Sequence, residues 1–229
     1  TALTNSCNPF FYEVGFLLNE RDPFLLPNYA RRLGLGAPTG LRGLQEAAGL
    51  IPDPDWIRTN RGYPWTYSDA VNMAIGQGEM QVTPLQMTRT YVAIANGGTL
   101  YTPQLILERG ILNQRTDMSK PEAASNFDVR PEVLELVHAG LCDVTFGVNG
   151  TAAHIFRLSP LEDIGVCGKT GTAQAPGAQP PHSWFMAYAP QDDPEIVVGM
   201  IVENSGDGSA IAAPLVRRIL EYYFFGPFD

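Results

Sequence analysis

The chain has 229 residues, enough to bury a substantial core as one large domain or as two smaller lobes. Its 45% hydrophobic and 17% charged residues are typical of a globular protein and exclude a disordered one. A formal net charge of -9 argues against nucleic acid as a partner, because phosphate binding needs a basic face, and no cluster of Lys or Arg suits anionic lipids.

The first third of the chain is predicted to hold two helices and a long loop. Pro9 and the helical spacing of the apolar residues after it predict a helix over residues 9–19. A second helix is predicted over residues 26–33, because glycines follow it directly. Residues 36–66 are dense in Gly and Pro, so we predict a long ordered loop there.

The next segments are predicted to be mainly helical. Residues 68–76 form a short helical segment, and Thr83 followed by Pro84 is typical of a helix N-cap and first turn. That helix should end at the Asn-Gly-Gly sequence of residues 96–98.

A strand or extended segment is then predicted over residues 100–107, followed by a polar stretch that reaches about Asp128. Pro131 opens a further helix with a clear apolar side, and this helix should end before Gly147.

The last part of the chain changes character and predicts a small sheet. Short strands are expected over residues 166–173, 184–189 and 196–202, and the short links between them predict antiparallel hairpins. The third strand is apolar at nearly every position, as expected for a strand covered on both faces. A helix over residues 212–225 should pack on this sheet.

The cysteines carry little functional signal. Cys7, Cys142 and Cys167 are too few and too scattered for a disulfide scaffold, and their small or apolar neighbours favour buried thiols. None of them has the spacing of a zinc site. The sequence therefore predicts neither a metal nor a cofactor.

The distribution of apolar residues also bears on membrane segments. No run of about 18 apolar residues occurs, so no span is predicted. No signal peptide is predicted, because Thr1 opens into what resembles the end of a helix. We therefore expect the chain to start inside a domain.

The sequence Lys169-Thr170-Gly171-Thr172 lies on a predicted strand, and the chain has only one other lysine, Lys120. A Lys beside two hydroxyls offers one cation and two hydrogen-bond donors to a carboxylate, and Gly171 leaves room for a close approach of substrate backbone. The N–H of Thr172 would serve as half of an oxyanion hole. The alternative is an ordinary edge strand with a protective Lys.

The sequence Ser6-Cys7-Asn8, just before Pro9, resembles many helix caps when it is taken alone. Its position upstream of the Lys-Thr-Gly sequence, with a helical lobe between them, argues against the helix-cap interpretation. The two motifs match the Ser-x-Asn and Lys-Thr-Gly signatures of β-lactamases and penicillin-binding proteins. A triad of Ser183, His182 and a nearby Asp is excluded, because triad residues converge from separate elements.

On these motifs the chain resembles class B penicillin-binding proteins of the elongation type, and the resemblance covers essentially its whole length. Residues 110–130 match least. The further segments that carry the resemblance are Ala48-Gly49-Leu50-Ile51-Pro52, Asn72-Met73-Ala74-Ile75-Gly76-Gln77-Gly78, Val82-Thr83-Pro84-Leu85-Gln86-Met87, Ala95-Asn96-Gly97-Gly98, Ser183-Trp184-Phe185 and Ala213-Pro214-Leu215.

The resemblance implies a mixed α/β (α+β) fold of the β-lactamase and transpeptidase type. Residues 1–160 would form a mainly helical lobe, and residues 161–229 the antiparallel strands and a C-terminal covering helix. The first strands and the nucleophile helix of the family would lie N-terminal to this chain.

The resemblance also implies an activity, that of a peptidoglycan D,D-transpeptidase that cross-links the cell wall through a serine acyl-enzyme. A serine attacks the D-Ala-D-Ala bond of a stem peptide, terminal D-Ala leaves, and an amine of a neighbouring stem resolves the acyl-enzyme. β-Lactams bind as mimics of the donor stem.

Site residues follow from the same resemblance. Ser6 and Lys169 would form a proton relay to the leaving nitrogen, and Asn8 would hold the amide of the acyl side chain. The hydroxyls of Thr170 and Thr172, on either side of Gly171, would bind the terminal carboxylate. The Thr172 N–H would line the oxyanion hole.

The nucleophile itself is missing from this sequence. Asp117 and Val166 occupy the positions three residues before the two lysines, so no Ser-x-x-Lys motif exists here. We expect the chain to be part of a longer protein, anchored in the membrane by an N-terminal segment, that acts outside the cytoplasm with cell-wall synthesis partners. A natural pseudoenzyme is the alternative for the missing motif.

The missing motif leads to two expectations for the isolated chain and leaves alternative functions open. Alone, the chain should be inactive toward penicillin, and an uncovered sheet edge should lead it to self-associate. A D,D-carboxypeptidase or a β-lactam-sensing domain is an alternative function on the same fold. A non-catalytic scaffold is another.

Overall fold

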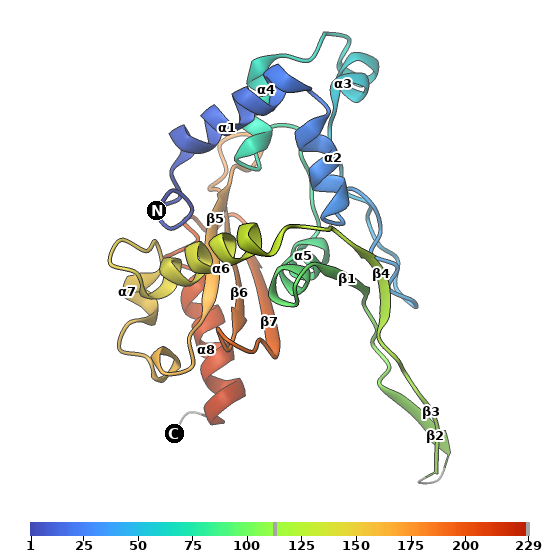
Figure 1. The fold of residues 1–229 in the computed structure, drawn as a ribbon, viewed down its shortest axis with the longest axis vertical. Helices are drawn as coiled ribbons and strands as arrows, with labels where there is room; N and C mark the ends of the chain where they lie inside the picture. The colour runs from blue at the N-terminus through green and yellow to red at the C-terminus, as the bar shows by residue number, and fades with distance from the viewer. Residues whose placement is uncertain (112–113, 228–229) are drawn as a thin grey trace.

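A computed structural model describes residues 1–111 and 114–227 of the chain (Figure 1). Helices α1 to α4 form an upper group, and the sheet with its helices lies below them, next to the chain's C-terminus (Figure 1). The helices before the sheet are α1 (Asn8–Arg21), α2 (Leu25–Arg32), α3 (Pro54–Arg61), α4 (Tyr67–Ala74), α5 (Pro84–Ala95), α6 (Pro131–Phe146), α7 (Ala153–Phe156) and the short 3-10 turn η1 (Pro160–Glu162).

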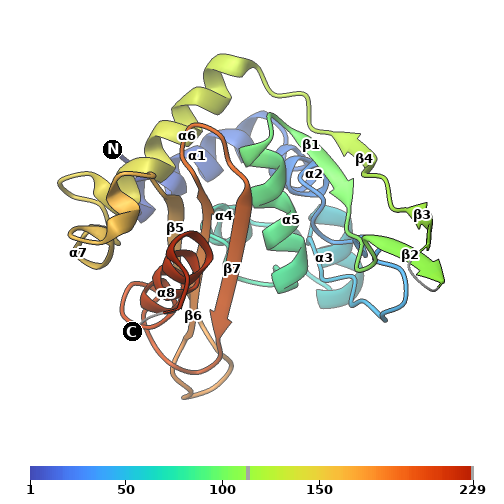
Figure 2. The same ribbon diagram turned by 90° about the horizontal axis from the view of Figure 1, so that it is seen from below.

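The sheet has the predicted form of three antiparallel strands in the order β5-β6-β7. The strands are β5 (Cys167–Ala173), β6 (His182–Ala189) and β7 (Ile196–Val202), and the last helix is α8 (Ala212–Phe225). Helix α8 covers one face, while α5 and α6 cover the other (Figure 2). The prediction that β7 is covered on both faces is confirmed, although its residues are mostly half-buried because it is an edge strand.

The main core lies between the sheet and α8. Phe185 on β6 is fully buried and stacks on Phe156 of α7, with 5.6 Å between the ring centres. Val216 and Leu220 of α8 close the cluster from the other side and are also fully buried. Each such side chain contributes about 1.5–3 kcal/mol relative to exposure, so this core fixes the position of β5 and β6.

The upper helices meet through a close contact between α1 and α4. A side chain on Gly15 of α1 would place its Cβ 2.7 Å from the Cβ of Ala74. Helix α4 begins with a capping box between Thr66 and Asp69, which fixes its start. The close packing sets the end of α4 against the start of α1, where two predicted site residues lie.

The structure corrects the prediction of an unbroken loop over residues 36–66, because α3 lies within it. Asp53 caps this helix by accepting a hydrogen bond from the Trp56 N–H at 2.8 Å, and Pro54 occupies the first turn. The Asp-Pro sequence is a good start signal, but the density of Gly and Pro around it masked the short helix.

The polar stretch that reaches Asp128 is also corrected, since it contains strands. The stretch contains β2 (Glu108–Ile111), β3 (Gln114–Met118) and β4 (Glu122–Asn126), while the strand predicted over residues 100–107 is shorter in the structure, as β1 (Thr99–Thr102). They form two-stranded ribbons, β1 with β4 and β2 with β3, and the second projects from the body as an arm (Figure 1). The side chains of β4 are exposed throughout, so no alternation of apolar and polar residues marked this strand.

The expectation of buried thiols is wrong for two cysteines. Cys142 of α6 and Cys167 of β5 form a disulfide, while Cys7 is a free thiol. Helix α6 packs on β5, so the fold brings together two cysteines that lie 25 residues apart in the sequence. The spacing alone held no sign of this packing.

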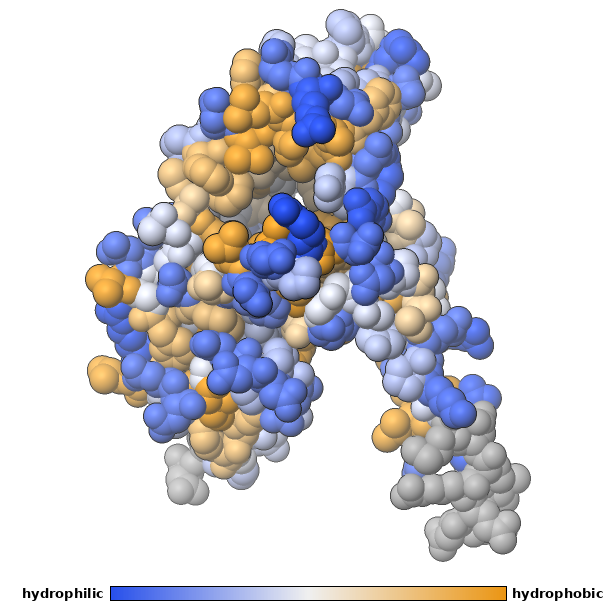
Figure 3. Space-filling model, viewed as in Figure 1, coloured by the Kyte–Doolittle hydropathy of each residue, from blue (hydrophilic) through white to orange (hydrophobic). Residues whose placement is uncertain are grey.

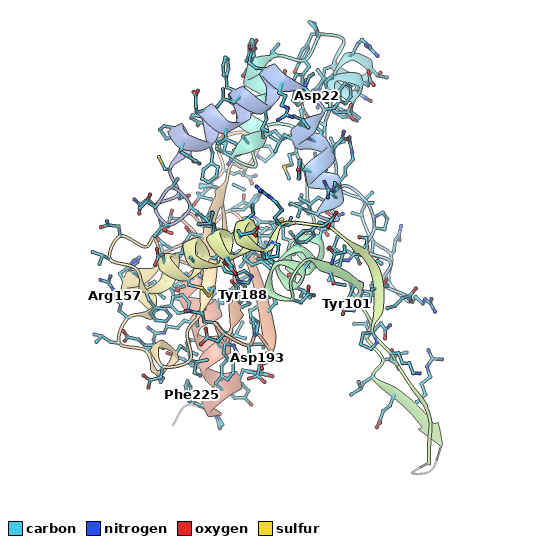
Figure 4. All side chains as sticks on the ribbon, in the orientation of Figure 1. Asp22, Tyr101, Arg157, Tyr188, Asp193 and Phe225 are labelled. Carbon is cyan, nitrogen blue, oxygen red and sulfur yellow. A yellow bond between two sulfur atoms is a disulfide. The ribbon has the colours of Figure 1, made fainter. Side chains whose placement is uncertain are left out.

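A partly buried polar pair lies next to the disulfide. The Tyr188 hydroxyl on β6 and Nδ1 of His138 on α6 are 2.6 Å apart, and Tyr188 lies in the sheet behind α6 (Figure 4). Burial raises the pKa of Tyr188. His138 thus joins α6 to the sheet.

Among the residues that the structure describes, no helix is long and apolar enough to cross a membrane. The same residues contain no group of three or more His, Cys, Asp or Glu side chains placed to hold a metal ion.

Candidate active site

A hollow of about 670 Å³ lies between the upper helices and the edge of the sheet at β5. The space-filling view shows the molecule hollowed between its upper and lower parts (Figure 3). The residues that line it come from the turn before α1, the end of α4, the loop after α6, strand β5 and the loop after β7: Leu3, Ser6, Asn8, Phe11, Ala74, Ile75, Gln77, Thr151, Lys169, Thr170, Gly171, Thr172, Asp207 and Ser209. All predicted site residues line this one hollow.

Lys169 and Ser6 are in direct contact across the hollow, although 163 residues separate them in the sequence. The Nζ of Lys169 donates to the Ser6 Oγ at 2.9 Å and to the carbonyl oxygen of Thr170, also at 2.9 Å. The ammonium group of Lys169 can therefore pass a proton directly to the Ser6 hydroxyl.

The environment of Lys169 favours its neutral form more than water does. Burial lowers the pKa of Lys169 to about 8, and the nearby carboxylate of Asp207 opposes this change. The amine thus remains mostly protonated near neutral pH and loses its proton in mildly alkaline solution. This is the range in which a group both donates and accepts protons readily.

Ser6 sits in a turn with an unusual backbone. Its φ angle is +50°, in the left-handed region that residues other than Gly seldom adopt. The N-cap of α1 is Cys7, which makes no side-chain cap bond, and the Ser6 hydroxyl accepts from Lys169. The structure thus contradicts the helix-cap interpretation of this sequence.

Asn8 is the first residue of α1, and its exposed side chain lines the hollow. No described contact holds its amide toward another side chain in this cleft. The structure thus places Asn8 and Ser6 on the wall of the same hollow.

The two threonines of β5 already have partners. The Thr170 hydroxyl lies 2.8 Å from that of Thr151, which follows α6. The Thr172 hydroxyl donates to Oδ2 of Asp207 at 3.1 Å. Gly171 lies between them, and a Cβ there would come within 3.1 Å of the Trp184 Cβ on β6.

Four polar lining residues were not predicted as site residues, namely Gln77, Thr151, Asp207 and Ser209. Gln77, in the turn after α4, donates from Nε2 to the Thr172 carbonyl oxygen at 3.1 Å and so ties the upper helices to β5. Its sequence context, Gly76-Gln77-Gly78, contributed to the family resemblance, but no role was assigned to Gln77. Asp207 and Ser209 lie in a Gly- and Ser-rich loop that gave no periodic signal.

Asp207 supplies the negative charge of the cleft. The Ser209 hydroxyl donates to its carboxylate and holds the pKa of Asp207 below its usual range, with help from the Ser209 N–H and the Thr172 hydroxyl. Asp207 is therefore ionised at neutral pH. Lys169 and Asp207 are the two charged residues among those lining the hollow.

A second hollow of about 490 Å³ adjoins the first around the end of β5. Its walls are largely apolar and come from α5, β6, β7 and the segment after α4, with Met80, Met87, Tyr91, Trp184 and Met186 among them. Trp184 is half-buried on this wall and packs against the core around Tyr188. His182 also lines the second hollow.

Comparisons with known proteins agree with this geometry. The family described as "Penicillin binding protein transpeptidase domain" matches residues 1–221. The peptidoglycan D,D-transpeptidase MrdA of Haemophilus influenzae is 32% identical over 97% of this chain, which corresponds to 35% of that protein. The chain spans roughly a third to two fifths of the length of the curated relatives it matches.

Solved structures have the same fold. A crystal structure of Pseudomonas aeruginosa PBP2 in complex with WCK 5153 is 30% identical, with a TM-score of 0.83 over 98% of this chain and 46% of the other. The complex between PBP2 and MreC from Helicobacter pylori is 29% identical, with a TM-score of 0.79 over 98% of this chain and 39% of the other.

Proposed function

Because the chain belongs to the penicillin-binding protein transpeptidase family, we propose that it forms the substrate-holding side of a peptidoglycan D,D-transpeptidase cleft. The observation that carries this proposal is the 2.9 Å contact between Lys169 and Ser6, which joins the two motifs in one hollow. The substrate is a stem peptide that ends in D-Ala-D-Ala, and β-lactams act as its mimics.

The nucleophilic serine is supplied by a part of the protein outside these 229 residues, because no Ser-x-x-Lys sequence occurs within them. Its hydroxyl oxygen forms the ester bond to the carbonyl carbon of the penultimate D-Ala, and the C–N bond to the terminal D-Ala breaks. The amine of the neighbouring stem then forms the new amide and releases the serine.

The residues of this chain move protons and hold the substrate. Lys169 passes a proton through Ser6 to the leaving nitrogen, and Asn8 binds the amide of the acyl chain. The Thr170 hydroxyl binds the terminal carboxylate beside Gly171, and the Thr172 N–H polarises the scissile carbonyl. The Thr172 hydroxyl reaches that carboxylate only after it leaves Asp207.

The protein acts outside the cytoplasm, held at the membrane by an N-terminal segment. A related protein, PBP2 of Helicobacter pylori, was solved as a complex with MreC. By analogy, the partners of this protein belong to the cell-wall synthesis machinery. The -9 charge is consistent with the absence of nucleic acid among them.

Fluorescent penicillin labelling of the natural protein that contains this chain tests the proposal. We expect a covalent label that boiling in detergent does not remove. Lys169→Ala should slow labelling about 100-fold or more, because the proton relay is lost. Arg218→Ala, on the helix at the far side of the sheet, is the matched control and should label as the parent does. Unchanged labelling of Lys169→Ala would contradict the proposed roles.

A further inference from the structure

Asp207 occupies the position where a ligand carboxylate is expected to bind. It lies in the loop between β7 and α8, and its Oδ2 is 3.1 Å from the Thr172 Oγ. An ionised carboxylate can only accept hydrogen bonds, so the Thr172 hydroxyl must be the donor. The proton of this hydroxyl therefore points to Asp207.

The Thr172 hydroxyl has few hydrogen-bonding positions left for a ligand. The Gly208 N–H donates to the same oxygen at 3.3 Å, so one lone pair is used as well. A hydroxyl has one proton and two lone pairs. What remains toward the cleft is a lone pair, which repels a carboxylate.

The loop that carries Asp207 is held tightly against β5. The buried Ser183 hydroxyl donates to the Asp207 carbonyl oxygen at 3.0 Å and accepts from the Ala212 N–H at 3.0 Å. A Cβ on Gly208 would lie 2.4 Å from the Gly171 carbonyl oxygen, which leaves no room for a larger residue. Asp207 is therefore fixed beside Thr172 by the backbone on both sides of it.

The charge of Asp207 is little compensated within the cleft. Lys169 is the one cation among the lining residues, and it donates hydrogen bonds to Ser6 and Thr170. His182 and Tyr91 are the other titratable groups nearby, in the second hollow. An incoming carboxylate thus meets an anion as well as a cation.

We propose that Asp207 is a specificity-determining residue, which holds the Thr172 hydroxyl away from an incoming ligand carboxylate and so restrains acylation by anionic ligands. This inference rests on the proposed function. A ligand carboxylate must displace Asp207 from Thr172 before it gains that hydrogen bond, whereas a ligand without this charge does not.

The test compares a penicillin with its uncharged methyl ester on the natural protein that contains this chain. Asp207→Asn removes the charge but keeps an oxygen that accepts from Thr172. We expect the second-order acylation rate constant to rise about fivefold for the free penicillin, since the charge is exposed and partly screened. The rate constant for the ester should stay within about twofold.

Glu203→Gln is the matched control, because it removes an exposed acid four residues away that does not line the hollow. Both of its rate constants should equal those of the parent. Raising the ionic strength from about 0.05 to about 0.5 M should also speed the parent with free penicillin and narrow its difference from Asp207→Asn.

Equal changes for both ligands, or slower acylation of Asp207→Asn by free penicillin, would overturn the inference while the proposed function stands. Failure of the parent to acylate with either ligand would instead refute the proposed function. Should Asp207→Asn fold poorly, the salt dependence of the parent decides alone, and a rate independent of salt overturns the inference.

Discussion

Lys169 is the residue whose surroundings most directly connect the structure to chemistry. It is a half-buried lysine that donates to a serine hydroxyl in a strained turn. Burial disfavours its charge, while Asp207 across the hollow favours it. As a result, the Lys169 ammonium can give up its proton near neutral pH.

The pH dependence of acylation should report this lysine. As the proton donor to the leaving nitrogen, Lys169 must be protonated, so the rate should fall as pH rises through about 8, the lowered pKa of this amine. Rates of penicillin acylation measured from about pH 6 to about 10 check this. A rate that instead rises through the same range would assign Lys169 the role of a base.

A second residue-scale prediction concerns the support of the Asp207 loop. Ser183→Ala should lower the free energy of unfolding by about 1–3 kcal/mol, because it leaves the Asp207 carbonyl and the buried Ala212 N–H without their partner. Urea unfolding measures this value. Ser68→Ala, which removes only an exposed 3.4 Å bond, should change it by less than about 0.5 kcal/mol. Equal values for the two variants would contradict the prediction.

At the scale of elements, side-chain hydrogen bonds fix the N-terminal end of helix α5. Thr83 and Gln86 form a reciprocal capping box, and the Gln86 amide also donates to the carbonyl oxygens of Ala37 and Ala48. The start of α5 therefore holds the loop before α3 as well as the helix itself. The helix itself packs on β1, β6 and β7.

Removing the cap should have a measurable cost. Thr83→Ala should lower the free energy of unfolding by about 1 kcal/mol, because the Gln86 N–H loses its acceptor. Thr88→Ala is the control on the same helix, since its hydroxyl donates only to a carbonyl one turn back. We expect a change under about 0.5 kcal/mol for the control. A loss as large in Thr88→Ala would show that capping is not the cause.

Elements with strong local signals were predictable from the sequence, and the others depended on tertiary contacts. The predicted bounds of β7 and α8 are those observed, because an uninterrupted apolar run and a regular helical stripe define them. The polar strands β2 to β4 have no such stripe. The Cys142–Cys167 disulfide depends on how α6 packs on β5, and sequence spacing does not contain that information.

The residues of the site likewise divide into those with a sequence signal and those that depend on tertiary contacts. The motif residues were found by their order along the chain, and the structure brings Ser6, Asn8 and Lys169 into one hollow. Asp207 and Gln77 were missed because they act through single contacts to Thr172 from irregular segments. A contact between a loop and a strand 35 residues away leaves no periodic trace.

At the scale of the whole molecule, the sheet has an edge that invites pairing. Strand β7 has no neighbour on its outer side among the described strands, and all seven of its residues are uncharged. Free edges of this kind pair with other chains. The isolated chain should therefore self-associate, with a mass in light scattering that grows with concentration. A constant monomer mass at high concentration would contradict this.

The division of labour between this chain and the rest of its protein is the central claim, and mass spectrometry of penicillin-treated protein tests it most directly. We predict no stable adduct on the isolated 229 residues, and one penicilloyl adduct on the natural protein that contains them. That adduct should map to a serine outside this chain, and Lys169→Ala should slow its formation. A stable adduct on the isolated chain, or on Ser6 in the natural protein, would contradict the account.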